Sequence, residues 1–166
     1  SYSYQTTQSL ADALGDANGS VFAMAGEGLA AINIGDGFIG SLTALESGSG
    51  YWLVANDDFS FSFNAGGGLT RAELPREVPT SYSYSQSDQQ AFYFVNSATI
   101  AGQALEVDDI IIAYNDNVIV GSRYWNGELT DVPAIGIDSE GGETYEGYCL
   151  AGDKVNFRVF DASADE

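Results

Sequence analysis

Carboxylates are the side chains of this sequence that could most readily do chemistry. The chain holds 24 Asp and Glu residues against five Lys and Arg, and it has no histidine, which excludes His-based triads and imidazole metal ligands. Glycoside hydrolysis needs only two carboxylates about 5–10 Å apart. Glu27, Asp109, Asp131 and Asp138 are candidates, but no motif selects a pair among them. We therefore expect a protein that is not an enzyme.

Acidic and amide side chains also gather at three places that could bind calcium. Ca²⁺ takes about six to eight oxygen ligands from carboxylates, carbonyls and Asn side chains. The segments 56–58, 115–117 and 131–143 supply such oxygens, although none has the spacing of an EF-hand loop. Turn-forming Asn and Asp explain the first two segments equally well. In the third, the carboxylates repel one another unless they are solvated or bridged by a cation. The predicted calcium ligands are Asp131, Asp138 and Glu140.

One aromatic cluster has the composition of a carbohydrate site. The apolar face of a sugar stacks on an exposed ring while polar neighbours bind its hydroxyls. Arg123, Tyr124, Trp125 and Asn126 stand together near the predicted end of a strand, and we predict that they bind a ligand such as a surface glycan. The alternative is that Trp125 packs over the edge of a sandwich while Arg123 pairs with Asp131 or another acid.

The formal net charge of −19 at pH 7 limits the partners. It repels nucleic acid and anionic lipid, and it favours divalent cations, cationic partners or simple solubility in a salty medium. The sequence has no transmembrane run, so we expect no membrane insertion. The glycine-rich segments 26–28 and 66–68 lack a following Lys-Ser/Thr, which excludes phosphate loops.

Cys149 is the only cysteine, so neither an intrachain disulfide nor a Cys-rich zinc site can form. Its neighbours Tyr148 and Leu150 favour a small core residue over a nucleophile. Pairing between two chains is the remaining alternative for an extracellular protein.

The elements that must position these residues centre on 108–125, DDIIIAYNDNVIVGSRYW. Two β-branched runs flank the turn-forming segment 115–117, which predicts a hairpin of buried strands. A short helix is predicted over 8–14, with Ser9 as its N-cap and Gly15 as its end. Trp52 lies in the apolar run YWLV and is expected in the core. Further strands are predicted at 1–4, 21–25, 30–34, 38–45, 51–55, 59–63, 81–84, 91–95, 98–100, 144–150 and 155–160, and an acidic loop at 131–142.

Composition sets the fold class. Twenty Gly, ten Tyr and nine Phe against three Pro favour many short strands joined by glycine-rich turns. Residues 66–80 break the strand pattern with glycines, prolines and arginines, and we interpret them as a linker. A long surface loop inside one domain is the alternative. The predicted fold is all-β: a small β-rich module with one short helix over 1–65, followed by an antiparallel β-sandwich over 81–166.

Two passages resemble a known pair of modules. Residues 25–53, AGEGLAAINIGDGFIGSLTALESGSGYWL, carry a GEG turn, a GSLT strand and a GxGYW ending. Residues 89–163 carry QQAFYF, DDIIIAY, VGSRYW and DVPAIG. They resemble tandem β-rich modules near the C-termini of secreted and surface proteins of marine bacteria, and in structural proteins of their phages. Asp108 stands where that family usually has Gly. The resemblance implies an extracellular, non-catalytic appendage and names no ligand.

These observations lead to two functional expectations. The first is a non-catalytic extracellular module for adhesion or surface recognition, on a bacterial surface protein or a phage fibre, with a surface glycan or other cell-surface ligand as partner. The second is a structural subunit or decoration protein of a filament, surface layer or virion. Such a subunit would self-associate through exposed strand edges, which the Tyr- and Ser-rich segments 1–4 and 81–84 could offer. Calcium is the one cofactor expected in either case.

Overall fold

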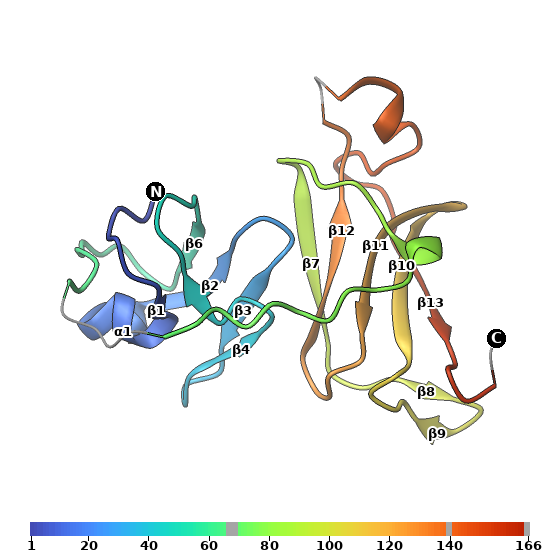
Figure 1. Cartoon of the computed structure of the whole chain (residues 1–166), viewed down its shortest axis with the longest axis horizontal. Helices are drawn as coiled ribbons and strands as arrows, with labels where there is room; N and C mark the ends of the chain where they lie inside the picture. Colours follow the sequence, from blue (N-terminus) through green and yellow to red (C-terminus); the bar gives the residue numbers. More distant parts are fainter. Residues whose placement is uncertain (66–69, 139–140, 165–166) are drawn as a thin grey trace. The chain divides into compact units, whose positions relative to one another are not determined.

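The computed structural model describes residues 1–65, 70–138 and 141–164. The chain divides into two compact units, unit 1 (Ser1–Leu74) and unit 2 (Pro75–Glu166). Strands dominate both units, and the sheets are antiparallel (Figure 1). The all-β prediction with one short helix is therefore confirmed. No helix among the described residues is long and apolar enough to span a membrane.

Unit 1 is built around a four-stranded sheet in the order β4-β3-β2-β6, with the short strands β1 and β5 paired beside it. Its helix is the predicted one, because Ser9 Oγ accepts a hydrogen bond from the Asp12 N–H at 3.1 Å and Gly15 ends the helix at φ +53°. Its elements are β1 (Gln8–Ser9), α1 (Leu10–Leu14), the 3-10 helix η1 (Gly15–Ser20), β2 (Val21–Ala25), β3 (Ala30–Asn33), β4 (Phe38–Gly40), β5 (Ala44–Leu45) and β6 (Trp52–Ala55).

The core of unit 1 lies against one face of this sheet, here called the inner face. Met24 and Ala31 point into it and meet the buried side chains of α1 and of the N-terminal segment. Tyr2 is completely buried and donates its hydroxyl hydrogen to Gln8 Oε1, which is also completely buried. The predicted strand at 1–4 is therefore wrong, since Tyr2 is a core anchor rather than part of an exposed edge.

Unit 2 packs a three-stranded sheet, β11-β10-β13, against the pair β12-β7, and β8-β9 forms a separate small hairpin. The hairpin predicted within 108–125 lies at the centre of this unit, because its first strand, β10, pairs with both β11 and β13. Its elements are the 3-10 helix η2 (Thr80–Tyr82), β7 (Gln90–Val95), β8 (Thr99–Ile100), β9 (Gln103–Ala104), β10 (Ile110–Asn115), β11 (Val118–Tyr124), β12 (Thr130–Ile135), the 3-10 helix η3 (Gly142–Tyr145) and β13 (Asn156–Phe160).

The two layers of unit 2 approach each other closely at Gly121. A Cβ atom built there would lie 1.7 Å from the carbonyl oxygen of Pro133 on β12, so only glycine fits. The hairpin turn between β10 and β11 uses Asp116 at φ +51°, which agrees with the tolerance of Asp for left-handed backbone. These two positions fix where β11 emerges beside β12, and so where Arg123 and Asp131 meet.

The segment 76–82 runs over the face of β11-β10-β13 that is turned away from β12, and we call it the strap (Figure 1). The ring of Tyr82 lies 5.5 Å from that of Phe160, and its carbonyl accepts a hydrogen bond from Ser122 Oγ at 2.7 Å. Ile110 and Ile112, on the same face, are 1% and 3% exposed. The strap thus seals a second face of this sheet.

The boundary between the units falls inside the predicted linker, and the described part of that linker is held at both ends. Thr70 donates its N–H to the carbonyl of Thr7, and Glu73 donates its N–H to Thr43 Oγ1, both within unit 1. Arg76 belongs to the strap of unit 2. Residues 66–68, the triple glycine, lie outside the described residues.

Four further strand and loop predictions are wrong. The predicted acidic loop at 131–142 contains the buried strand β12, and 81–84 forms part of η2 and an irregular continuation rather than a strand. The predicted strand at 144–150 is largely η3 and turns, and 59–63 forms no strand. In each case, tertiary packing rather than local pattern decides the conformation.

Candidate functional site

The predicted ligand-binding group at the end of β11 does not form one open surface. Arg123 is 8% exposed, and its guanidinium lies inside unit 2. Nε donates to the Asp131 carbonyl oxygen at 2.9 Å, and an Nη donates to the Asp131 carboxylate at 3.2 Å. Because Asp131 is itself only 3% exposed, the two charges neutralise each other in the interior. Arg123 is a structural residue in this geometry.

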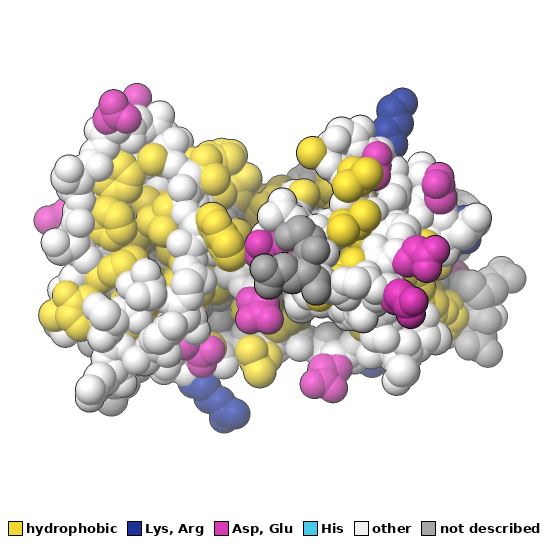
Figure 2. Space-filling model, turned by 90° about the horizontal axis from the view of Figure 1, so that it is seen from above, with side chains coloured by type: hydrophobic (Ala, Val, Ile, Leu, Met, Phe, Trp, Pro, Cys, Tyr) yellow, Lys and Arg dark blue, Asp and Glu magenta, His cyan; other side chains and the backbone are white. Residues whose placement is uncertain are grey.

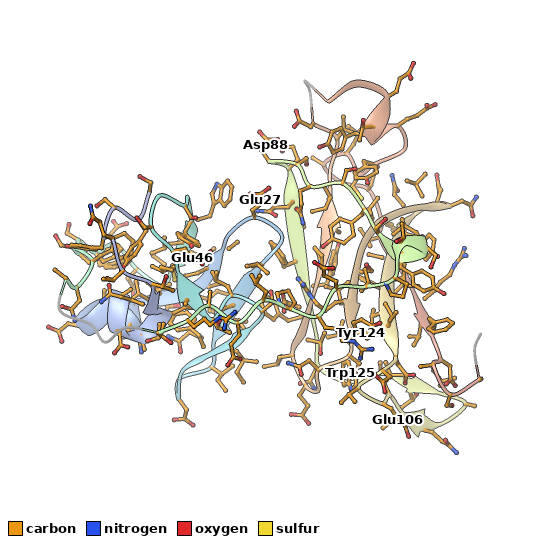
Figure 3. The ribbon with its side chains drawn as sticks, viewed as in Figure 1. Glu27, Glu46, Asp88, Glu106, Tyr124 and Trp125 are labelled. Carbon is orange, nitrogen blue, oxygen red and sulfur yellow. The ribbon has the colours of Figure 1, made fainter. Side chains whose placement is uncertain are left out.

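Its three neighbours diverge. The Trp125 ring is half-buried and packs against the core of unit 2. The backbone N–H of Trp125 donates to the Asp109 carbonyl at 2.8 Å. Tyr124, which is labelled beside Trp125 in Figure 3, lies under the guanidinium of Arg76. The guanidinium carbon stands 3.8 Å from the centre of the tyrosine ring. Asn126 donates its backbone N–H to Thr130 Oγ1 at the start of β12. This arrangement matches the alternative weighed for the sequence, with Trp125 at the sandwich edge and Arg123 paired to Asp131.

The two predicted calcium ligands that the structure describes, Asp131 and Asp138, make different contacts. The Asp131 carboxylate faces Arg123, whose positive charge occupies the place that a cation would take. Asp138 is half-buried, and its carbonyl accepts the N–H of Gly141 at 3.1 Å. Glu140 lies outside the described residues. Within 1–65, 70–138 and 141–164, no three His, Cys, Asp or Glu residues converge to hold a metal. Calcium binding by this loop stays a prediction.

Asp109, a candidate for acid–base chemistry, is used as a structural cap. It is 5% exposed, and its two carboxylate oxygens accept the N–H groups of Glu106 at 2.8 Å and of Ala162 at 3.0 Å. The carboxylate therefore closes the β9–β10 connection and ties the C-terminal segment to it. Glu27 is exposed in the β2–β3 turn of unit 1.

The outer face of the unit 1 sheet is an uncovered apolar surface that sequence reasoning missed. Side chains that are opposite one another in the register, Ile39, Ile32, Ala23 and Val54, form one row across β4-β3-β2-β6. Trp52 stands two residues before Val54 on the same face, and both are 55% exposed. The expectation that Trp52 lies in the core is therefore wrong. Phe22 and Ile34 add 45% and 50% exposed side chains at its margin.

This outer face has an uncharged centre and an acidic rim. No Asp, Glu, Lys or Arg occurs in β2, β3, β4 or β6. Exposed carboxylates stand instead in the connections at both ends of the strands, namely Glu27 between β2 and β3, Asp36 between β3 and β4, and Asp57 and Asp58 after β6. Figure 2 shows hydrophobic side chains gathered at the surface of unit 1, on the left. Contiguous exposed apolar surface of this kind is typical of a contact site.

Cys149 behaves as the sequence predicts for a packing residue. It is half-buried against the core of unit 2, and it borders a pocket of about 390 Å³ with Gly136 and Ile137. Burial is the main cause that raises the pKa of its thiol, and the nearby Asp153 carboxylate adds to the rise. A raised pKa keeps the sulfur protonated at neutral pH, which disfavours nucleophilic chemistry.

Comparison of the chain with protein-family models, with curated protein sequences and with solved structures found no match.

Proposed function

We propose that this protein is a non-catalytic recognition module of an extracellular surface and that it binds its partner through the outer face of the unit 1 sheet. The observation that carries the proposal is the exposure of Trp52 and Val54 at the centre of an uncharged sheet face in a chain with a net charge of −19. Large aromatic side chains at the centre of a patch supply most of the energy of typical contacts. The carboxylates argue in the same direction, because Asp109 and Asp131 are engaged in structural contacts.

The acidic rim favours a foreign partner over a second copy of the chain. A face-to-face dimer would bring the exposed carboxylates of Glu27, Asp36 and Asp57 on one copy close to those of the other. Like charges around a desolvated centre oppose association unless salt screens them. A neutral polysaccharide or a cationic protein surface has no such penalty. The strand edges invoked for self-association at 1–4 and 81–84 are not strands in this fold.

The extracellular location is supported by the resemblance to surface modules and by the charge. An excess of carboxylates keeps a protein soluble where ionic strength is high, since screening reduces its self-repulsion.

The test compares two pairs of exposed apolar side chains. The variant Trp52→Ser/Val54→Ser removes the centre of the outer face, and the control Val107→Ser/Leu150→Ser removes side chains of unit 2 that are 68% and 63% exposed. The assay measures depletion of each protein from solution by intact bacterial cells and by suspended cellulose and chitin. We expect the parent and the control to be retained and the Trp52/Val54 variant to lose at least about tenfold in affinity.

Sedimentation velocity across a concentration series completes the test. A parent protein that stays monomeric and is retained supports recognition. Growth into larger species that the Trp52/Val54 variant abolishes would instead establish the structural-subunit alternative. Equal retention of both variants would refute the assignment of this face.

A further inference from the structure

Unit 1 contains a second surface feature, a pocket of about 550 Å³ between η1 and the segment 59–64. Small-molecule sites in proteins have volumes of about 300–1,000 Å³ and combine apolar walls with a few polar groups. None of the outer-face residues lines this pocket. Its walls instead include Phe59, which packs against the core on the inner face of the sheet.

One wall of the pocket is aromatic. Phe59 and Phe61 are stacked with ring centres 5.3 Å apart and planes 23° apart, and Phe61 meets Phe63 edge-on at 5.1 Å. Phe59 and Phe63 pack against the core, so they hold Phe61 in place. Phe61 itself is 37% exposed. The alternation of Phe and Ser from 59 to 63 thus presents a fixed, partly open ring instead of a paired strand.

The remaining walls are polar and hydrogen-bonding. The polar residues Ser20, Ser60, Ser62, Asn64 and Asp16 line the pocket. Two backbone features position this wall. Gly15, at φ +53°, turns the chain from α1 into η1. The N–H of Asn64 donates to the Ala13 carbonyl at 2.8 Å, which ties the segment 59–64 to the helix.

We propose that this pocket binds a neutral sugar residue, stacked on Phe61 with its hydroxyls bonded to the serines, Asn64 and Asp16. The apolar face of a pyranose matches an exposed aromatic ring, and its hydroxyls match short polar side chains that both donate and accept. A purely apolar ligand would leave the polar wall without partners. No Lys or Arg lines the pocket, and Asp16 repels anions, so phosphates and acidic sugars are excluded.

This inference does not rest on the role of the outer face. The pocket would bind sugar even if Trp52 contacted nothing, and the outer face would bind a partner even if the pocket stayed empty. The two assignments therefore fail separately.

The experiment is a nuclear magnetic resonance titration of the whole chain with defined probes. The neutral probes are glucose, galactose, mannose and N-acetylglucosamine, and the charged probes are glucuronate and choline. At least one neutral sugar should shift the backbone amides of Gly15, Ser20, Ser62 and Asn64 in a saturable manner, whether or not the outer-face amides also respond. Glucuronate should produce no such shifts.

Two variants test the contacts, with Trp52→Ala as the matched aromatic control in the same unit. Phe61→Ala removes the stacking ring and should weaken binding about tenfold, whereas Trp52→Ala should leave the dissociation constant unchanged. Asp16→Asn, at an exposed carboxylate, keeps the shape and should weaken binding severalfold without affecting the fold. It keeps the test decisive if Phe61→Ala unfolds unit 1.

Three results would overturn the proposal. The first is the lack of saturable shifts with every neutral sugar up to tens of millimolar. The second is a set of shifts centred on other residues, and the third is binding of choline without any sugar, which would make the pocket a cation site of Phe61 and Asp16. An outer face that fails its own test while sugar still shifts the pocket amides would leave this inference intact.

Discussion

Each unit contains an apolar sheet, and the two units differ in how many faces of that sheet are covered. In unit 2, the sheet β11-β10-β13 is covered on one face by β12-β7 and on the other by the strap, so Ile110 and Ile112 are almost completely buried. In unit 1, the sheet β4-β3-β2-β6 is covered only on its inner face. Its outer face leaves Trp52 and Val54 more than half exposed. The strands of both sheets are similarly apolar, and the difference lies in what covers them.

The two tryptophans of the chain differ in burial in the same way as the two sheets. The Trp125 side chain packs against the core of unit 2. Trp52 stands on an open sheet face. An apolar side chain that is buried contributes to stability, and one that is left exposed contributes little to it. The comparison therefore predicts that unit 2 uses its tryptophan for folding and unit 1 keeps its tryptophan for contact.

The largest expected effect is in unit 1, whose stability depends on its single covered face. Tyr2→Ala opens a cavity in that core and leaves the buried Gln8 without its hydroxyl partner. We expect a loss of about 5 kcal/mol in the free energy of unfolding, from the cavity and from the unsatisfied amide together. Hydrogen exchange monitored by mass spectrometry should show lost protection in β2 and β3.

Tyr2→Phe is the matched control for that prediction, because it keeps the ring and removes only the hydroxyl. It should cost about 1–3 kcal/mol. Deletion of residues 1–4 should behave like Tyr2→Ala. A deletion variant with undiminished protection in β2 would show that the N-terminal segment is dispensable.

The next effect concerns the buried ion pair of unit 2. Arg123→Ala leaves the Asp131 carboxylate buried without its cation, and breaking such a pair costs about 3–5 kcal/mol. Thermal unfolding followed by the fluorescence of Trp125, in a Trp52→Phe background, reports on this unit. Arg158→Ala is the control, since that guanidinium lies over the Tyr114 ring on an exposed part of β13 and should change the melting temperature little.

The sequence predicts correctly those parts of the fold whose conformation depends only on neighbouring residues. The β-branched runs on either side of Asp116 became β10 and β11, and Ser9 and Gly15 bound α1 because a cap depends only on neighbouring backbone. These elements carry their information within a few residues.

The errors occur where the deciding partner is distant in sequence. Asp131 and Pro133 are typical of loops, yet they lie in β12 because Arg123 neutralises the acid and β7 pairs with the strand. Trp52 was expected in the core because an apolar run indicates that a side chain prefers burial. It does not indicate whether a second layer is present to bury it. Both parts of the candidate site in unit 1, the open face and the Phe61 pocket, are consequences of tertiary packing.

A smaller effect should follow from removing the strap contact that unit 1 lacks. Tyr82→Ala deletes the half-buried ring over Phe160 and uncovers part of the outer face of β11-β10-β13. We expect a loss of about 1–3 kcal/mol in unit 2 and increased binding of a hydrophobic dye. Tyr93→Ala, which removes another partly exposed ring of the same unit, should not increase dye binding at that face. Unchanged dye binding by Tyr82→Ala would contradict the role of the strap.

The two units should begin to lose stability at different alkaline pH values. Burial raises the pKa of Cys149 and of Tyr84 in unit 2, and it raises the pKa of Tyr2 in unit 1. A group with a raised folded-state pKa stabilises the fold fully below its unfolded pKa, and this contribution is lost as the pH rises through the folded value. Unit 2 should therefore begin to lose stability above about pH 8.5, where the unfolded thiol ionises, and unit 1 only above about pH 10.

Unit-resolved melting curves between pH 7 and 11 test this order. Cys149→Ala should abolish the earlier loss in unit 2 and leave the later loss, which depends on Tyr84. Simultaneous destabilisation of both units in the parent protein would contradict the assignment.

The smallest expected effect on stability is the most informative about the open face. Trp52→Ala should change the free energy of unfolding by no more than about 0.5 kcal/mol, because its side chain is already 55% exposed. Trp125→Ala should cost clearly more, since it removes a ring from the packed edge of unit 2. Acrylamide, which is uncharged and so insensitive to the acidic surface, should quench Trp52 more strongly than Trp125 in the two single-tryptophan variants. Equal quenching would mean that something covers Trp52 in solution, and a second copy of the chain would then be the first partner to test by dilution.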